Sequence, residues 1–438
     1  MRNNSKKLLA LLLAFVMLML CACSTGGNTP ANNTEAPAEP TPEPETPMID
    51  ILKSLDSIEF TDAKNVILFI GDGMGQYHIP ATDDILGGRY DGKLGIEYLT
   101  NQGIVNTTCV QGEPDSASGG TAYATGYKSN RVSLGLTAKK EAVQNVVELA
   151  ISLGKKAGVV TSESIVDATP AAFTVHAPNR NDESEIAKLQ IENCPDFIIG
   201  GGKAMYELAF EKDPSYKDKL TENNITWATT WEEVEAFDGT NGKLIATLVD
   251  DYWERAEEAS PTLEQMTKKA LSLLSKSEEG FFLMVEGGAM DESAHESDVM
   301  ETCRQMIEFD KAVCLGIRYA AEHPDTIVIV TADHNTGGLL PKADADKAIA
   351  GHEKEFHVSS LLDYEKEIQE NYPDVILADL PYRFSTIAHT NDKVQVFAIG
   401  YGTEIFNDET VASFEIGKFI GQSLSKQDFG ATKKNGQS

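Results

Sequence analysis

The chain has 438 residues with 68 acidic and 37 basic side chains, and its formal net charge of −31 argues against a nucleic-acid partner. Its 41% hydrophobic and 24% charged residues are those of an ordinary globular protein that can form a sizeable core without disulfide staples. Surface acidity helps to keep an exported protein in solution. An acidic protein that binds phosphate also needs local positive charge, which bound metal ions can supply.

The first segment of the chain is typical of export. Two lysines precede an apolar run over residues 8–20, which is too short for a comfortable membrane span and fits the core of a signal peptide. The letters LCAC that end this run resemble the cleavage box of bacterial lipoproteins. We therefore expect residues 1–22 to be a lipoprotein signal peptide and Cys23 to be lipidated. The Pro-, Thr- and Glu-rich residues 23–47 would be an extended tether at the outer face of the bacterial cell membrane, or in a periplasm. Ordinary signal cleavage, which leaves Cys23 a plain thiol, is the alternative.

Short β-rich runs alternate with helical patterns after the tether. The predicted strands, in chain order, are Val66–Ile70, Gly158–Thr161, Phe197–Ile199, Phe281–Val285, Thr326–Val330 and Val394–Ile399. Most are continuous apolar runs, as in parallel strands that are buried on both faces. Apolar residues at three- and four-residue spacing predict helices over residues 143–153 and 263–274. This alternation predicts an α/β fold over residues 48–425, with a doubly wound, mostly parallel central sheet flanked by helices.

Residues 335–388 interrupt the alternation with a polar, mixed composition. We interpret them as a small insertion that caps one edge of the sheet, and residues 426–438 as a polar tail.

Four cysteines remain in the mature chain, and none forms a CxxC pair, so a cysteine zinc site is not expected. Cys303 and Cys314 would lie about 16 Å apart on one continuous helix, which is too far for a disulfide. We expect buried free thiols, and a disulfide between Cys109 and Cys194 is the alternative for that pair.

Polar residues come directly after three of the predicted strands. Asp72 follows the first, Glu286 the fourth, and the pair Asp333-His334 the fifth. Ligands of open α/β sheets bind beyond the carboxyl ends of the strands, so these side chains are expected to meet at one edge. An aspartate in a Gly-Asp-Gly turn more often only shapes the turn. The prediction of a site therefore rests on three strands that deliver acids to the same edge.

Asp291 and His295 stand four residues apart, a spacing that puts both on one face of a helical turn, where they can converge on one ion. His389 precedes the last predicted strand. Carboxylate and imidazole ligands without thiolates suit zinc, and an all-oxygen subset suits magnesium. A solvated acidic loop is the alternative for the Asp291–His295 pair taken alone.

Ser116 is the candidate nucleophile. Small residues follow it and run into a predicted helix, and a helix N-terminus offers free N–H groups that can bind phosphate oxygens. A plain helix cap is the commoner use of serine at such a place. A free hydroxyl is a weak nucleophile, and metal coordination is the plausible activator here. Arg180 offers the bidentate guanidinium that phosphate prefers, unless it is only a surface side chain.

In combination these motifs closely resemble the alkaline phosphatase family. The resemblance runs from about Lys64 to Gly402. It rests on the segments NVILFIGDGMG, PDSASGGTAYATG, VTSESIVDATPAAFTVHAPNR, MVEGGAMDESAH, IVTADHNTGG and AHTNDKVQVFAIG.

The resemblance implies a role for each matching residue. Ser116 would be the nucleophile that is phosphorylated, and Arg180 the phosphate clamp. Three ions would be held, two Zn²⁺ and one Mg²⁺. The ligand sets are Asp291, His295 and His389 for the first zinc, Asp72, Asp333 and His334 for the second, which also activates Ser116, and Asp72, Thr169 and Glu286 for magnesium.

The implied reaction is hydrolysis of a phosphate monoester through a phosphoserine, which a metal-activated water then hydrolyses. The implied partners are small phosphorylated substrates, the membrane through lipidated Cys23, and a second copy in a homodimer. Asp167 stands where some members have aspartate and others histidine, and Glu292 replaces a Lys or His that is often found after the ligand Asp291. These two acids predict weaker phosphate retention and a firm dependence on added magnesium.

Two other functions are alternatives to phosphate monoester hydrolysis. A phosphodiesterase or a sulfatase of the same superfamily would keep the site, but such relatives usually carry a different nucleophile and often lack the magnesium ligands. A lipoprotein that binds a solute for a transporter would share the lipoprotein box and the tether, but it would need neither Ser116 at a helix start nor paired zinc sites.

Overall fold

The computed structural model describes residues 46–350, 361, 364–366, 368–407 and 409–431. The predicted signal peptide, Cys23 and nearly all of the tether lie outside these residues, as does most of the predicted polar tail. In the part of the chain that is described, we find no helix with the length and apolar character that a bilayer crossing requires.

The core of the fold is a ten-stranded sheet with the strand order β14-β2-β13-β8-β1-β7-β3-β4-β6-β5. β13 runs antiparallel to both of its neighbours, and the other described pairs of this sheet are parallel. The strands are β1 (Asn65–Gly71), β2 (Asn101–Asn106), β3 (Lys156–Ser164), β4 (Phe197–Gly201), β5 (Ile225–Ala228), β6 (Lys243–Thr247), β7 (Phe281–Gly287), β8 (Thr326–Thr331), β13 (Val394–Ile399) and β14 (Thr410–Ala412).

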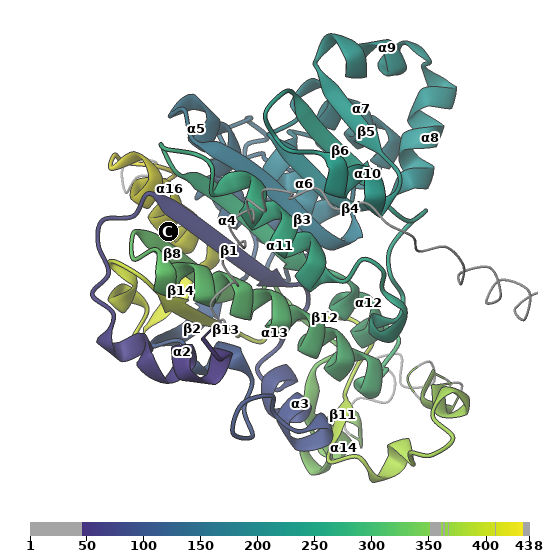
Figure 1. Cartoon of the computed structure of the whole chain (residues 1–438). Coiled ribbons are helices and arrows are strands. Elements are labelled where there is room, and N and C mark those ends of the chain that lie inside the picture. Colours follow the sequence, from purple (N-terminus) through teal and green to yellow (C-terminus); the bar gives the residue numbers. More distant parts are fainter. Residues whose placement is uncertain (1–45, 351–360, 362–363, 367, 408, 432–438) are drawn as a thin grey trace, which may run out of the picture. The chain divides into compact units, whose positions relative to one another are not determined.

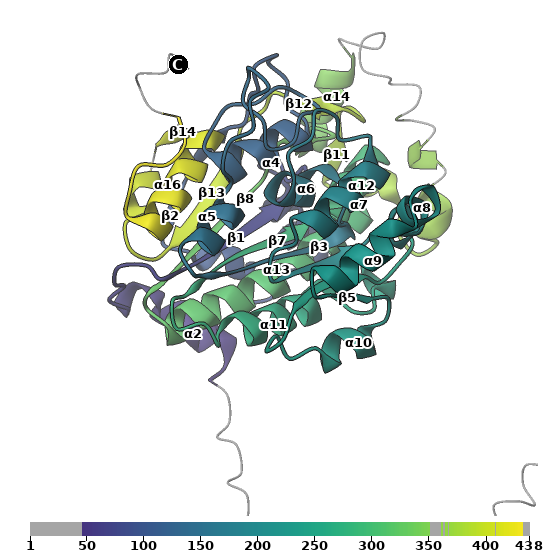
Figure 2. The same ribbon diagram turned by 90° about the horizontal axis from the view of Figure 1, so that it is seen from above.

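Helices cover both faces of this sheet, which explains why its central strands are apolar at every position. Both β1 and β7 are buried along their whole length. The helices α11 (Leu263–Leu274) and α13 (Val299–Glu322) pack on one face, and α5 (Val146–Ser152), α6 (Ala168–Thr174) and α16 (Ser413–Ser425) on the other. Figure 1 shows the first layer in front of β1, and Figure 2 shows both layers from above. The predicted doubly wound, mostly parallel α/β sheet is confirmed.

The remaining helices surround this framework. They are α2 (Met48–Ser54), α3 (His78–Leu86), α4 (Ser116–Thr125), α7 (Glu183–Glu192), α8 (Lys203–Lys212), α9 (Ser215–Glu222), α10 (Trp231–Ala236), α12 (Ala289–His295) and α14 (Lys342–Ala350). All six predicted strands are present, each with the bounds given above. The four strands that the sequence did not reveal, β14, β2, β6 and β5, lie at the two margins of the sheet, where shorter apolar runs suffice.

The predicted insertion over residues 335–388 leaves the sheet after β8 and returns before β13. Its base is closed by the antiparallel pair β9 (Asn335–Thr336) and β12 (His389–Thr390), and above it β10 (Leu339–Pro341) pairs with β11 (Tyr382–Phe384). A small apolar cluster packs the insertion against helices of the main domain. It includes Ala81, Ala294, Val299, Cys303, Leu339 and Phe384. The insertion therefore packs directly against α12, the helix that ends at His295.

All four cysteines of the described region are buried free thiols. Cys303 and Cys314 both lie on α13, as predicted. Cys109 and Cys194, whose pairing the sequence left undecided, do not form a disulfide.

Candidate active site

The register of the central strands brings the predicted acids together. Ile70 of β1 is paired with Glu286 of β7 on one side and with Thr331 of β8 on the other. Asp72 and Asp333 each follow two residues later at the same edge. The expectation that three strand ends deliver their acids to one place is confirmed.

A glycine after Asp72 allows these groups to approach closely. Gly73 has a φ of 65°, in the left-handed region, and a Cβ there would lie 2.5 Å from Asp291 Oδ1. Its amide donates to Asp333 Oδ1 at 3.2 Å. The turn after β1 therefore joins the Asp291 and Asp333 sides of the site through backbone that only glycine can supply.

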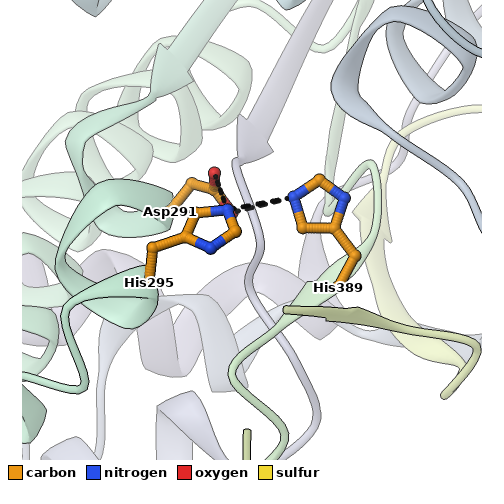
Figure 3. A group of neighbouring side chains, drawn as sticks. All are labelled: Asp291, His295 and His389. Carbon is orange, nitrogen blue, oxygen red and sulfur yellow. Dashed lines mark hydrogen bonds and ion pairs between the residues drawn. The ribbon is translucent and has the colours of Figure 1, made fainter. Parts of the chain in front are cut away.

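A first group of side chains converges from α12 and β12, as Figure 3 shows. His295 Nε2 lies 3.2 Å from Asp291 Oδ2 and 3.1 Å from His389 Nε2. The two Nδ1 atoms face backbone carbonyls, of Ile387 at 2.6 Å for His295 and of Pro114 at 3.1 Å for His389. Without a metal, Nε2 of His295 donates its proton to Asp291. When a cation replaces that proton and each Nδ1 carries the ring proton, the lone pairs of both Nε2 atoms point at one spot. Such an arrangement suits a cation between them.

A second group surrounds His334 Nε2. Ser116 Oγ lies 3.1 Å from this nitrogen, Asp333 Oδ2 3.3 Å and Asp72 Oδ1 3.4 Å. All four side chains are buried. The resemblance assigned Asp72, Asp333 and His334 to the second zinc and Ser116 to the nucleophile. In the structure the other three side chains lie around His334 Nε2.

Asp291 connects the two groups. Together with Asp72 and His334 it forms a second set of possible metal ligands, in addition to its set with His295 and His389. Thr336 donates to Asp291 Oδ1 and lies 3.1 Å from His334 Nδ1. One hydroxyl therefore fixes both the shared carboxylate and the ring of His334.

The charges of the site are unbalanced without a cation. Burial, and then the neighbouring acids, raises the pKa of Asp72 well above its usual value, and that of Asp333 to about 7. Burial lowers the pKa of His334, so this ring does not supply positive charge. Burial alone would raise the pKa of Asp291, but the hydrogen bond from His295 and the other two histidines hold it below its usual value. Buried carboxylates of this kind need metal ions or protons.

Unpartnered oxygen atoms mark where cations fit. Asp72 Oδ1, Asp333 Oδ2, Glu286 Oε1 and Thr169 Oγ1 are buried and form no hydrogen bond with the described residues. Asp333 Oδ2 belongs to the mixed nitrogen and oxygen set around His334, which suits zinc. Glu286 and Thr169 add oxygen only, which suits magnesium. The donor chemistry of both kinds of site therefore fits the predicted ions.

Ser116 is the first residue of α4, but it is not the helix cap. The cap is Asp115, whose side chain accepts from the Ser118 amide at 3.0 Å. Asp115 therefore satisfies the helix end, and the Ser116 hydroxyl is not needed as its cap. The hydroxyl of Ser116 instead faces His334, at the positive end of the α4 dipole.

Arg180 is held in place from two directions. Its Nη2 donates to Asp167 Oδ1 at 2.7 Å, and its amide donates to the Val132 carbonyl at 2.8 Å. The Val132 amide in turn donates to Asp115 Oδ2 at 2.9 Å. A short chain of hydrogen bonds thus links the arginine to the residue before Ser116 and holds it near the predicted nucleophile.

The acid Glu292 allows a test by charge reversal. It is exposed and directly follows Asp291. Glu292→Lys exchanges a repulsive charge for an attractive one near the site, and we expect it to tighten inhibition by free phosphate roughly 3- to 10-fold, the size suited to a solvent-screened charge. The inhibition constant for inorganic phosphate in both proteins measures this, and an unchanged value would refute the predicted effect of Glu292.

Sequence reasoning missed two hydroxyls that position the acids. One is Thr336; the other is Thr161 at the end of β3, which donates to Glu286 Oε2. Strand register supplies the only signal for the second, because Thr161 pairs with Glu286 across β3 and β7. A threonine in a strand is otherwise unremarkable.

Comparison with known proteins agrees with this geometry. The alkaline phosphatase family model matches residues 63–233 and 246–414. Alkaline phosphatase 4 of Bacillus subtilis (strain 168) is 28% identical over 360 residues, which cover 76% of this chain and 74% of the relative. The membrane-bound alkaline phosphatase of Bombyx mori is 28% identical over 331 residues, 62% of this chain but only 60% of that protein. The structure of the alkaline phosphatase from the Antarctic bacterium TAB5 is similar with a TM-score of 0.68 and 28% identity, over 84% of this chain and 100% of that one. The chain belongs to the alkaline phosphatase family, whose members are metal-dependent.

Proposed function

We propose that this protein hydrolyses phosphate monoesters to an alcohol and inorganic phosphate, through a phosphoserine on Ser116. The observation that carries the proposal is the placement of Ser116 Oγ, Asp72 and Asp333 within 3.4 Å of His334 Nε2. A nucleophile that shares one cation with three ligands is activated without a separate base.

The proposal assigns two Zn²⁺ and one Mg²⁺ to the three ligand sets. Asp291, His295 and His389 would hold one zinc, Asp72, Asp333 and His334 the other, and Asp72, Thr169 and Glu286 the magnesium. When bound, such ions lower the pKa of a coordinated hydroxyl or water and neutralise charge on the entering and leaving oxygens.

The residues of the chain perform the remaining tasks. Ser116 Oγ releases its proton to solvent and forms the new bond to phosphorus as the bond to the ester oxygen breaks, and the alcohol leaves with a proton from solvent. Hydrolysis of the phosphoserine then takes a hydroxide equivalent from water and restores the serine. Arg180 would bind two phosphoryl oxygens, and Asp167 holds the plane of its guanidinium through the 2.7 Å hydrogen bond.

Rates on two model substrates distinguish this function from that of a related phosphodiesterase. We expect kcat/KM for nitrophenyl phosphate to exceed that for bis-nitrophenyl phosphate by roughly a hundredfold or more, because a second ester group removes one anionic oxygen from the clamp. A faster rate on the diester would contradict the proposal. A protein that binds metal but turns over neither substrate would favour the solute-binding function.

We also propose that the protein is exported and anchored through lipidated Cys23, in line with the apolar run, the LCAC box and the Pro-rich tether. Metabolic labelling with palmitate is expected in the wild type and should be lost in Cys23→Ala; labelling that persists in the variant would contradict the anchor. The homodimer that the family resemblance implies stays a prediction.

A further inference from the structure

A glutamate that none of the predicted ligand sets includes lies beside the proposed magnesium site. Glu163 stands near the end of β3, and its side chain is buried, with the residue only 8% exposed. The pairing of β3 with β4 becomes irregular between Val160 and Ser164, and irregularities of this kind re-aim side chains at strand ends.

Hydrogen bonds connect Glu163 to Glu286. The Glu163 amide donates to Thr161 Oγ1 at 2.8 Å, and the same hydroxyl donates to Glu286 Oε2. Among the described residues, Glu163 Oε1 accepts a hydrogen bond only from the adjacent Ser164 amide, at 3.1 Å. The threonine thus sets the spacing between two buried glutamates on neighbouring strands.

A glycine allows the two acids to come together. A Cβ on Gly288 would lie 3.2 Å from Glu163 Cγ and 3.3 Å from Glu286 Oε2, and it would clash with Glu163 Cβ. Both glutamates therefore border the same small volume, which any larger residue at position 288 would fill. The amide of Gly288 donates to Ser162 Oγ at 3.0 Å, which holds the two strand ends at this distance.

Three oxygens of Glu163 and of the proposed magnesium ligands lack hydrogen-bond partners in the described part of the chain. Glu163 Oε2, Glu286 Oε1 and Thr169 Oγ1 are buried and form no hydrogen bond with the described residues. Burial, and then Asp167, raises the pKa of Glu163 well above its usual value, and Glu292 and Glu286 add to this effect. Burying a carboxylate in acidic surroundings is unfavourable unless a cation balances it.

We propose that Glu163 is a further anionic partner of the cation assigned to Asp72, Thr169 and Glu286, and that it sets the affinity of that site for a hard divalent ion. The three unpartnered atoms are all oxygens. Mg²⁺ prefers oxygen ligands and keeps bound waters, from which a nearby carboxylate can accept hydrogen bonds. The inference rests on the proposed function only in that it uses the same third cation.

Binding of Mg²⁺ to the zinc-loaded protein tests this directly, by equilibrium dialysis followed by metal analysis. Glu163→Gln keeps the shape and removes the charge, and we expect it to weaken the Kd for Mg²⁺ by about 10- to 100-fold with zinc content unchanged. Glu163→Asp keeps the charge but moves the carboxylate back by one methylene group. Its Kd for Mg²⁺ should lie between those of the wild type and Glu163→Gln. The matched control is Glu301→Gln, a buried glutamate held by Arg255 and the Ala256 amide, which should leave the Kd unaltered. A Kd within about twofold of wild type in Glu163→Gln would overturn the proposal.

The melting temperature of the metal-free proteins separates this from a packing role. Without its cation, Glu163 is a buried acid with an unpartnered oxygen, and glutamine avoids the cost of burying it. Metal-free Glu163→Gln should therefore melt at least as high as the metal-free wild type. A variant that binds Mg²⁺ weakly and also melts lower without metal would assign Glu163 to packing and overturn the proposal. The Kd for Mg²⁺ and the melting temperature can both be measured even if the protein does not hydrolyse monoesters. The role of Glu163 and the proposed function can therefore be refuted independently.

Discussion

Ser116→Ala is expected to lower kcat for nitrophenyl phosphate by roughly three orders of magnitude while the protein keeps its metals. In the proposed mechanism the substitution removes the atom that forms the covalent intermediate, whereas Asp72, Asp333 and His334 stay in place as candidate metal ligands. Residual activity is expected because water near the ions can still attack, as when a nucleophile is removed from other hydrolases. Single-turnover kinetics with metal analysis of the same sample measure both properties.

A suitable control lies on the same helix. Thr125 ends α4, and its buried hydroxyl donates to the Thr121 carbonyl at 2.7 Å. Thr125→Ala removes a buried hydroxyl about two and a half helical turns from Ser116 and should retain activity within a few-fold. If Ser116→Ala kept more than about a tenth of the wild-type rate, or lost its metals, the role assigned to Ser116 would be wrong.

Removal of the bound metals is expected to abolish hydrolysis and to make stability strongly dependent on pH. In the metal-free protein burial raises the pKa of Asp333 to about 7 and that of Glu286 to about 8. Between about pH 4 and pH 8 the folded protein then binds more protons than the unfolded chain, so its stability falls as the pH rises through this range. Metal-loaded protein should lack this loss, because the cations balance the ionised carboxylates.

Melting temperatures with and without a chelator, at about pH 6 and about pH 9, check this prediction. We expect the chelated protein to melt roughly 5 °C or more lower at the higher pH, and the loaded protein to change less. Readdition of zinc and magnesium should restore both activity and melting temperature. A chelated protein that is fully active, or whose stability rises with pH, would contradict the assignment of these acids to metal sites.

The sequence was most informative where secondary structure fixes geometry. Continuous apolar runs predicted the central strands, because helices on both faces leave no position of β1 or β7 exposed. The four-residue spacing of Asp291 and His295 placed both on one turn of α12, and α12 holds them as predicted. Strand ends and helical spacing thus predicted where most of the acids meet.

The sequence could not predict the contacts that depend on how distant elements pack together. The proximity of Thr161 and Glu163 to Glu286 depends on the register between β3 and β7 and on an irregularity in β3. His389 was uninformative alone, because only the return of the insertion at β12 brings it to His295. Marginal strands such as β5 and β14 are too short for a clear pattern, and their neighbours in the sheet define them.

The most direct test of the account is to trap the intermediate on Ser116. The metal-loaded protein is mixed with excess inorganic phosphate or nitrophenyl phosphate, quenched in acid, digested and examined by mass spectrometry. We predict one phosphoryl group on the peptide that contains Ser116, at that residue, and none on the same peptide of Ser116→Ala. An active protein that gives no phosphoserine, or that is phosphorylated at another residue, would contradict the central claim.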